Sequence, residues 1–244
     1  MTQITSPHNH KLKEIRKLRM RRRARERAGR FVAEGEDLLA AADAAGWQPL
    51  ERFCVEGSGL AGLEVDAKLL ASASGLGSGT RTLAVYEERW AERAAGPLCV
   101  YLHGVHDPGN VGAVMRAAAA FGASSVALGP ASADPFSPKA VRASMGAVFS
   151  VPVVREGDLR ALPGTKIALT TVATAPLAGL WRFTKEADRP PVTLVVGSER
   201  EGLPREVLDR ADGAVRIPIQ SDSLNAAMAA TIALYEVTRM APAR

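Results

Sequence analysis

Apolar residues in the second half of the chain gather into short runs, many of them rich in β-branched residues. Such runs are typical of strands buried in a parallel sheet, and they cover residues 98–102, 125–128, 150–154, 167–171, 194–196 and 213–217. Helical stretches are predicted between them, near residues 110–121, 138–146, 204–210 and 223–239. This alternation predicts an α/β domain with a mostly parallel, doubly wound sheet, whose ligand site lies beyond the carboxyl ends of the strands.

The first half of the chain shows a different pattern. Leu12, Ile15 and Leu18 recur at helical spacing and predict a helix over residues 8–28 with one buried edge, which Gly29 ends. Shorter elements are predicted after it: strands at 31–33, 52–55 and 82–86, and helices at 36–45 and 68–71. We therefore expect a small α/β domain over residues 1–90, a charged, alanine-rich linker over 91–97 and a second domain over 98–244.

Positive charge is concentrated in the predicted first helix. Lys11–Arg30 contains eleven lysines or arginines and two glutamates, a local charge of +9 in a chain whose net charge is +5. So dense a patch suits a polyanion, because phosphates neutralised by the protein release their counterions. A solvated helix face is the alternative, whereas the narrow apolar stripe disfavours a membrane-surface helix. The candidate phosphate contacts are Lys11, Lys13, Arg19, Arg22 and Arg23.

Composition narrows the class of protein. The apolar fraction of 47% and charged fraction of 23% are those of an ordinary globular protein. No apolar stretch approaches the roughly 20 residues that span a bilayer, and polar Met1–Pro7 leads into a cationic helix. We therefore expect no membrane span, no secretory signal and a cytoplasmic location.

Cysteine, histidine and tryptophan give no sign of a metal or redox site. Cys54 and Cys99 are far apart and are expected to be buried in strands. No metal site is expected, because the histidines lack cysteine or acidic partners at ligand spacing; they are His8, His10, His103 and His106. We expect Trp47, Trp90 and Trp181 to serve in packing.

Three segments of the second domain carry polar residues where strands end. In the first, Asp107–Gly109 forms a turn, Asn110 is placed to cap the next helix, Gly112 permits a close approach and Arg116 should emerge at the sheet edge. No GxGxxG pattern is present, which excludes a dinucleotide-binding turn.

The other two segments are ambiguous when taken alone. Glu199 lies in a turn between a strand and a helix, and is either a solvated loop acid or part of a site. Ser221 or Ser223, together with Asn225, could simply cap the last helix.

Taken together and in this order, the three segments resemble the signature of the SpoU/TrmH family of RNA 2'-O-ribose methyltransferases. The matching positions are Asn110, Gly112 and Arg116; then Gly197, Ser198, Glu199 and Gly202; then Ile217–Ile219 with Ser223–Asn225. Residues 137–153 also look like the family's stretch between the first two motifs. The cationic N-terminal region resembles the ribosomal-protein-like substrate-binding domain of many members, so the likeness spans nearly the whole chain.

The resemblance implies a fold and a cofactor. The fold is a mostly parallel sheet with a trefoil knot, the SPOUT fold, preceded by a small ribosomal-protein-like α/β domain and working as a homodimer. S-adenosyl-L-methionine (AdoMet) would lie bent in the knot as methyl donor, held by backbone groups near Thr170, Thr171, Gly197, Ile217, Ile219 and Leu224. No metal is implied. The acceptor would be structured RNA, with ribosomal RNA preferred over tRNA.

The resemblance also assigns roles to side chains. Arg116 would handle the proton of the ribose 2'-hydroxyl, either by losing its own proton or by staying charged and clamping a phosphate while another group accepts the proton. Asn110, Glu199, Ser223 and Asn225 would orient Arg116, the ribose and the knot loops. Arg142 could contact RNA phosphate or a partner subunit, or serve only at the surface.

The third motif departs from the family pattern. The loop between Ile217 and Ser223 is about two residues shorter than the pattern, and Ala226–Ala227 follows where Val-Ser is common. Two alternatives therefore stand beside the RNA methyltransferase: a non-catalytic RNA-binding protein with a degenerate AdoMet site, and a methyltransferase for a small molecule or a protein.

Overall fold

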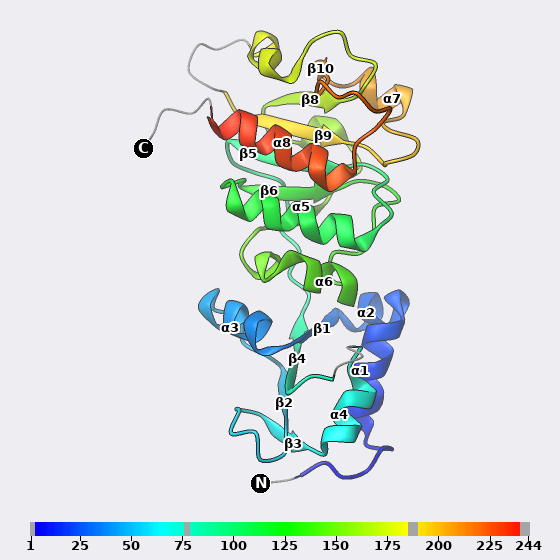
Figure 1. The fold of residues 1–244 in the computed structure, drawn as a ribbon, viewed down its shortest axis with the longest axis vertical. Coiled ribbons are helices and arrows are strands. Elements are labelled where there is room, and N and C mark those ends of the chain that lie inside the picture. The colour runs from blue at the N-terminus through cyan, green and yellow to red at the C-terminus, as the bar shows by residue number, and fades with distance from the viewer. Residues whose placement is uncertain (1–2, 76–78, 185–189, 240–244) are drawn as a thin grey trace. The chain divides into compact units, whose positions relative to one another are not determined.

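The computed structural model describes residues 3–75, 79–184 and 190–239 (Figure 1). The chain packs into two compact units. The N-terminal unit comprises Met1–Arg89 and Asp134–Phe149, and the C-terminal unit comprises Trp90–Ala133 and Ser150–Arg244. The segment 134–149 therefore packs with the N-terminal unit, although it lies within the predicted second domain.

The N-terminal unit is built on a four-stranded sheet of order β1-β4-β2-β3. β4 is antiparallel to both β1 and β2, whereas β2 and β3 are parallel. The strands are β1 (Arg30–Glu34), β2 (Glu51–Val55), β3 (Leu63–Val65) and β4 (Thr82–Glu87), and the helices are α1 (His10–Met20), α2 (Arg22–Ala28), α3 (Glu36–Ala44) and α4 (Ala67–Ala73). Three-residue β3 was not predicted, because so short a run carries no clear periodicity.

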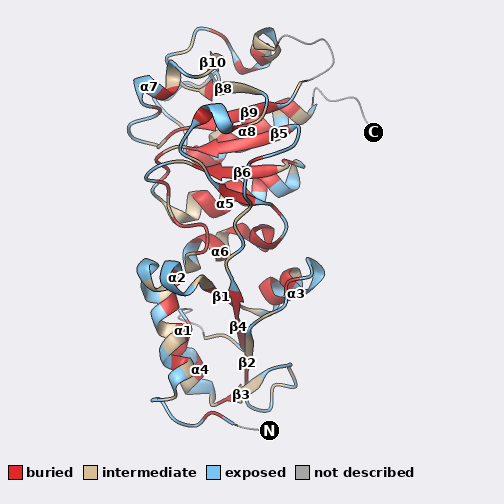
Figure 2. Ribbon diagram, turned by 180° about the vertical axis from the view of Figure 1, so that it is seen from behind, coloured by how far each residue is buried: buried red, intermediate tan, exposed pale blue. Residues whose placement is uncertain are grey.

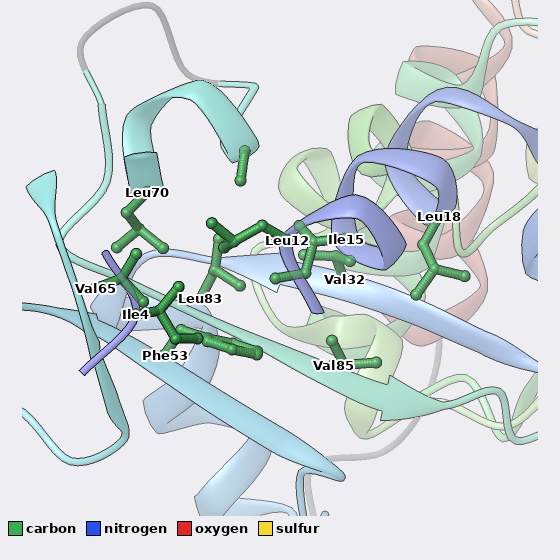
Figure 3. Close-up of a cluster of buried hydrophobic side chains, with 11 residues drawn as sticks. Ile4, Leu12, Ile15, Leu18, Val32, Phe53, Val65, Leu70, Leu83 and Val85 are labelled. Carbon is green, nitrogen blue, oxygen red and sulfur yellow. The ribbon is translucent and has the colours of Figure 1, made fainter. Parts of the chain in front are cut away.

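One face of this sheet is covered by α1 and α4. Leu12, Ile15 and Leu18 are at most 2% exposed, which confirms the buried edge predicted from their spacing. They belong to a cluster that also contains Phe53 of β2 and Leu70 of α4 (Figure 3).

The single helix predicted over residues 8–28 is wrong. α1 ends at Met20, Arg21 is extended at φ −128° and ψ 113°, and α2 then runs to Gly29, whose φ of 61° ends it. The break turns Arg25 inward, where it is 4% exposed. Its guanidinium donates to the carbonyl of Leu18 at 2.6 Å, one of the carbonyls that a helix end leaves unpaired.

The other face of the same sheet is aromatic and is completed by the segment 134–149, which forms α6 (Pro138–Ser144) and the 3-10 turn η1 (Ala147–Phe149). Phe136 lies 4.9 Å from Phe31 between ring centroids, and Phe149 lies 5.2 Å from Trp47. Trp47 Nε1 donates to the Phe149 carbonyl at 2.8 Å. Trp47 is thus a packing residue, as predicted, and residues 134–149 cover this face together with α3, which contacts β1, β4 and η1.

The C-terminal unit holds a six-stranded sheet of order β10-β8-β9-β5-β6-β7. All its pairings are parallel, which confirms the predicted parallel sheet. The central strands β5, β6 and β9 are buried throughout (Figure 2). The strands are β5 (Leu98–Leu102), β6 (Ser125–Leu128), β7 (Val153–Arg155), β8 (Thr165–Leu169), β9 (Val192–Val196) and β10 (Gly213–Val215).

Helices α5 (Pro108–Ala120) and α8 (Ala226–Arg239) pack side by side in this unit (Figure 1). The remaining helical segments are short: η2 (Leu159–Ala161), η3 (Leu177–Phe183) and α7 (Arg205–Leu208). The register pairs Leu169 with both Val196 and Val215, so β8, β9 and β10 end level with one another. The loops that follow these three strands therefore leave from the same edge of the sheet.

Burial confirms the expectation for the two cysteines. Cys54 in β2 and Cys99 in β5 are free and at most 1% exposed, as predicted. Among the helices of the described residues, none is long and apolar enough to cross a membrane.

Candidate active site

A cavity of about 330 Å³ opens at the carboxyl edge of the sheet, between the loops that follow β8, β9 and β10. Small-molecule sites in proteins have volumes of this order. All six residues proposed for AdoMet line it: Thr170, Thr171, Gly197, Ile217, Ile219 and Leu224. The structure therefore brings together residues that are up to 54 positions apart in the chain.

The cavity lining combines apolar residues with charged residues that are mainly acidic. Leu169 and Val196 come from strand ends, and Leu203 and Leu208 from around α7. The charged residues are Glu199, Arg200, Glu201 and Asp222, three carboxylates against one guanidinium. This lining suits a ligand with an apolar body and a cationic centre.

The loop after β9 is a tight turn that only glycine permits at its start. Ser198 and Gly202 exchange backbone hydrogen bonds of 3.2 and 3.1 Å. A Cβ on Gly197 would lie 2.4 Å from the carbonyl carbon and oxygen of Gly202 and 2.7 Å from the Leu203 nitrogen. Gly197 thus lets the turn close against the cavity.

The loops after β8 and β10 support each other. The Thr170 N–H donates to the Val215 carbonyl at 3.0 Å. Beyond β10, Arg216 donates its N–H to the Ala175 carbonyl at 2.9 Å and accepts from the Leu177 N–H at 2.8 Å. These backbone bonds fix two walls of the cavity without using any charged side chain.

The predicted cap of α5 needs correction. Asp107 caps this helix, and its Oδ1 accepts from the N–H groups of Gly109 at 2.5 Å and Asn110 at 3.4 Å. Asp107 precedes Pro108 at the first helical position, the order that helix starts favour. The side chain of Asn110 is therefore available for other contacts.

Asn110 joins the three motifs. Its Oδ1 accepts from Asn225 Nδ2 at 3.0 Å, and its Nδ2 donates to Glu199 Oε1. Asn225 also caps α8, because its Oδ1 accepts from the N–H groups of Ala227 at 2.9 Å and Met228 at 3.2 Å. The cap foreseen for Asn225 is confirmed, and it is combined with a side-chain network.

The remaining predicted catalytic residues lie outside this network. Ser223 lines the cavity and is exposed. Arg116 is exposed on α5. Within the described residues, the hydrogen bonds that join Asn225, Asn110 and Glu199 do not extend to Arg116.

Among the predicted phosphate contacts of the cationic N-terminal region, some side chains form ion pairs within the unit and others are exposed. Lys11 pairs with Glu51, and Arg19 pairs with buried Glu34 at 2.6 Å. Both cations are therefore paired within the unit, and their role as phosphate contacts stays a prediction. Lys13, Arg22 and Arg23 are exposed, whereas Arg142 on α6 is half-buried.

The helix break adds cations that the sequence analysis did not single out. Lys17, Arg21 and Arg27 are exposed and, together with Arg22 and Arg23, line an open depression of about 800 Å³. The extended backbone at Arg21 makes this depression between α1 and α2. The density of arginines in the sequence was the available signal, but a continuous helix would have spread them around its axis.

Next to the cavity-forming strands, Tyr101 and His103 form a neutral pair. Tyr101 Oη lies 3.3 Å from His103 Nδ1. Burial raises the pKa of Tyr101 to about 12 and lowers the pKa of His103 below its ordinary value.

In the described ranges, no three histidine, cysteine, aspartate or glutamate residues are grouped so that they could hold a metal ion.

Comparisons with known proteins agree with this geometry. Residues 97–235 match the model of the SpoU rRNA Methylase family, and residues 9–88 match that of the MRM3-like substrate binding domain. An uncharacterized tRNA/rRNA methyltransferase from Synechocystis sp. is 31% identical over 97% of this chain and 93% of its own length. The 23S rRNA (guanosine(2553)-2'-O)-methyltransferase RlmP from Bacillus subtilis is 28% identical over 97% of this chain and 99% of its own.

A solved structure extends the agreement to the fold. The crystal structure of AdoMet-bound rRNA methyltransferase from Sinorhizobium meliloti superposes with a TM-score of 0.86 at 30% identity, over 99% of each chain. It confirms the predicted fold class, with the small α/β domain preceding the parallel sheet. The family model alone covers more than half of the chain, and the chain therefore belongs to the SpoU rRNA methylase family.

Proposed function

We propose that this protein transfers a methyl group from AdoMet to a ribose 2'-hydroxyl of ribosomal RNA, and that it does so at the cavity beyond β8, β9 and β10. Membership of the SpoU family makes the chain an AdoMet-dependent RNA methyltransferase. The observation that carries the assignment to this site is that the second and third motifs line one cavity, while Asn110 of the first motif is hydrogen-bonded to Glu199 and Asn225 of the other two.

The cavity fits AdoMet chemically. Its apolar lining residues suit the adenine ring, and we assign the nucleoside to backbone groups of Thr170, Gly197 and Ile217, which line the cavity. The acidic lining suits the sulfonium and ammonium groups. When bound, AdoMet supplies an electrophilic methyl group, so the protein's task is to align the acceptor oxygen and to manage its proton.

Arg116 is assigned to the acceptor. Arginine side chains remain protonated in proteins, so an exposed guanidinium on α5 is suited to hold a phosphate beside the target ribose. Alignment of this kind can lower a barrier by about 7–11 kcal/mol. Ser223, an exposed residue of the cavity lining, is assigned to the ribose.

The preference for ribosomal RNA rests on the N-terminal unit and the relatives. The RlmP relative is named for 23S rRNA, and residues 9–88 match a substrate binding domain. We assign phosphate contacts to Lys13 and to the depression lined by Lys17, Arg21, Arg22, Arg23 and Arg27. Residues 1–90 would thus serve the RNA and residues 98–244 the chemistry, in the cytoplasm, where ribosomal RNA functions.

A homodimer is supported by an exposed apolar face of α8. Met228, Ile232 and Tyr235 of α8 are 60%, 39% and 53% exposed and recur at helical spacing, so they form one apolar stripe. Such stripes mark interfaces, and a two-fold axis would bring the same stripe from each copy together. Replacement of Ile232 by glutamate should produce monomers in sedimentation velocity. Arg205→Glu, at an exposed position of α7, should leave the dimer intact.

AdoMet binding and turnover of an Arg116 variant test the proposal. Arg116→Ala should bind AdoMet in calorimetry as tightly as the wild type and lose methyl transfer to RNA. Arg205→Ala, which removes an exposed arginine of α7 that pairs with Asp209, is the matched control and should transfer at the wild-type rate. Wild-type turnover by Arg116→Ala would contradict its role, and no binding of AdoMet at millimolar concentration would favour the non-catalytic RNA-binding alternative.

A further inference from the structure

The hydrogen bonds from Asn225 through Asn110 to Glu199 have a fixed direction. A side-chain amide offers an acceptor oxygen on one side and an NH₂ donor on the other. The oxygen of Asn225 is committed to the cap of α8, where it accepts two backbone N–H groups. The NH₂ of Asn225 therefore faces Asn110.

The orientation of the Asn225 amide also fixes that of the Asn110 amide. Because its oxygen accepts from Asn225, its NH₂ must face Glu199. The capping of α8, which begins at Ala226, therefore determines that the NH₂ group of Asn110 contacts the carboxylate of Glu199. Glu199 receives a donor on Oε1, and within the described residues no hydrogen bond engages Oε2.

We propose that Glu199, rather than Arg116, accepts the proton of the ribose 2'-hydroxyl, and that Asn110 and Asn225 are positioning residues that hold this carboxylate for the task. The inference rests on the proposed function. Carboxylates are ordinarily ionised at neutral pH and can accept a proton, whereas a guanidinium already carries one. Arg116 then keeps its charge and its place on the RNA phosphate.

The proposed step is balanced. The 2'-O–H bond breaks and its proton passes to Glu199 Oε2, while the 2'-oxygen forms a bond to the methyl carbon. The bond from that carbon to sulfur breaks, and its electron pair stays on the sulfur. The sulfonium charge and the carboxylate charge disappear together, and the protonated Glu199 later loses its proton to water.

Glu199 differs from the other charged groups of the cavity. Arg200, Glu201 and Asp222 are exposed, whereas Glu199 is half-buried. The side chain of Glu199 is also hydrogen-bonded to Asn110, which in turn is hydrogen-bonded to Asn225, so Glu199 is linked to the other two motifs. A general base needs such a fixed orientation in addition to basicity.

The substitution Glu199→Gln tests the assignment, because glutamine keeps the size and the oxygen that accepts from Asn110 but is not basic. It should lower kcat by about 10²- to 10⁴-fold and abolish the acidic limb of the pH–rate profile. AdoMet affinity should fall far less than kcat, because Glu201 and Asp222 keep the lining acidic, and RNA affinity should stay unchanged. The control Glu206→Gln removes an exposed carboxylate of α7 outside the cavity lining and should leave both kcat and that limb unchanged.

The positioning role is tested at Asn225. A serine hydroxyl can still cap the helix. Serine lacks the separate NH₂ group with which Asn225 donates to Asn110. Asn225→Ser should therefore keep the thermal stability of the wild type, lower kcat on the order of 10- to 100-fold, and move the acidic limb to higher pH because the ionised carboxylate loses an oriented donor. A purely structural role would leave the position of that limb unchanged.

A readout without turnover completes the test. In protein free of AdoMet and RNA, the ¹⁵N resonance of the Asn110 side chain should shift with the protonation of Glu199, and Glu199→Gln should remove that shift. Unchanged kcat, a retained acidic limb or lost AdoMet affinity in Glu199→Gln would overturn the inference, as would an Asn110 resonance that does not titrate in the wild type. If the wild type neither binds AdoMet nor methylates RNA, the proposed function itself fails.

Discussion

A buried ion pair joins Arg25 and Asp134, which lie 109 positions apart in the chain, within the N-terminal unit. Arg25 Nη2 lies 2.6 Å from Asp134 Oδ2, and the two side chains are 5% and 8% exposed. Asp134 Oδ1 also accepts from the Phe136 N–H at 2.9 Å. Asp134→Ala would therefore leave a buried guanidinium without its counter-charge and loosen the turn that places Phe136 in the aromatic core.

The size of the effect follows from burial. Removal of one partner of a buried pair costs about 3–5 kcal/mol, whereas an exposed pair contributes about 0–1 kcal/mol. The pair between Arg30 and Glu14 is 43% and 39% exposed, so Glu14→Ala is a matched control within the same unit. A loss of about 3 kcal/mol would be a large fraction of the roughly 5–15 kcal/mol that stabilises a typical domain.

Urea unfolding followed by tryptophan fluorescence measures the difference. The chain has three tryptophans, and a background with Trp90→Phe and Trp181→Phe leaves Trp47, which packs in the N-terminal unit. Asp134→Ala should lower the free energy of unfolding by about 3–5 kcal/mol. The double variant Arg25→Met with Asp134→Leu should regain part of that loss, because no charge is then left buried. A loss in Asp134→Ala no larger than in Glu14→Ala would refute the argument.

Three further predictions concern the C-terminal unit. Gly197→Ala should abolish AdoMet binding in calorimetry, because its Cβ would lie 2.4 Å from the Gly202 backbone, whereas Gly157→Ala, with nothing within 4 Å, should bind normally. Asp107→Ala should cost about 1 kcal/mol in thermal unfolding through loss of the α5 cap; an unchanged Tm would contradict the cap. The raised pKa of Tyr101, about 12 against 10.0, favours the folded state below pH 10, and this contribution should fade as the pH rises from 10 to 12. Tyr101→Phe should flatten that alkaline decline in a denaturant series.

Patterns of local spacing were sufficient for the strands of the parallel sheet, for the buried edge of the first helix and for the motifs. Leu12, Ile15 and Leu18 predicted a buried helix edge, and the apolar runs predicted the parallel sheet, because both signals depend on residues close in sequence. The order of the three motifs was sufficient for the family. Chain connectivity was not accessible in this way, since no periodicity reveals how loops thread past one another.

Long-range pairings account for what the sequence could not predict. The break at Arg21 depends on a partner for Arg25 that lies in the segment 134–149. The half-buried side chain of Arg19 pairs with Glu34 in β1. Asn110 could be identified from the motif, but not the direction of its hydrogen bonds, which a cap on α8 decides.

Methyl incorporation mapped to a single nucleotide tests the central claim most directly. The protein would be incubated with labelled AdoMet and total RNA, and the modified position determined by ribose-methylation mapping. We predict labelling of ribosomal RNA at a ribose 2'-oxygen that depends on Arg116. A label on a base, on protein or on a small molecule, or no label in ribosomal RNA, would contradict the account.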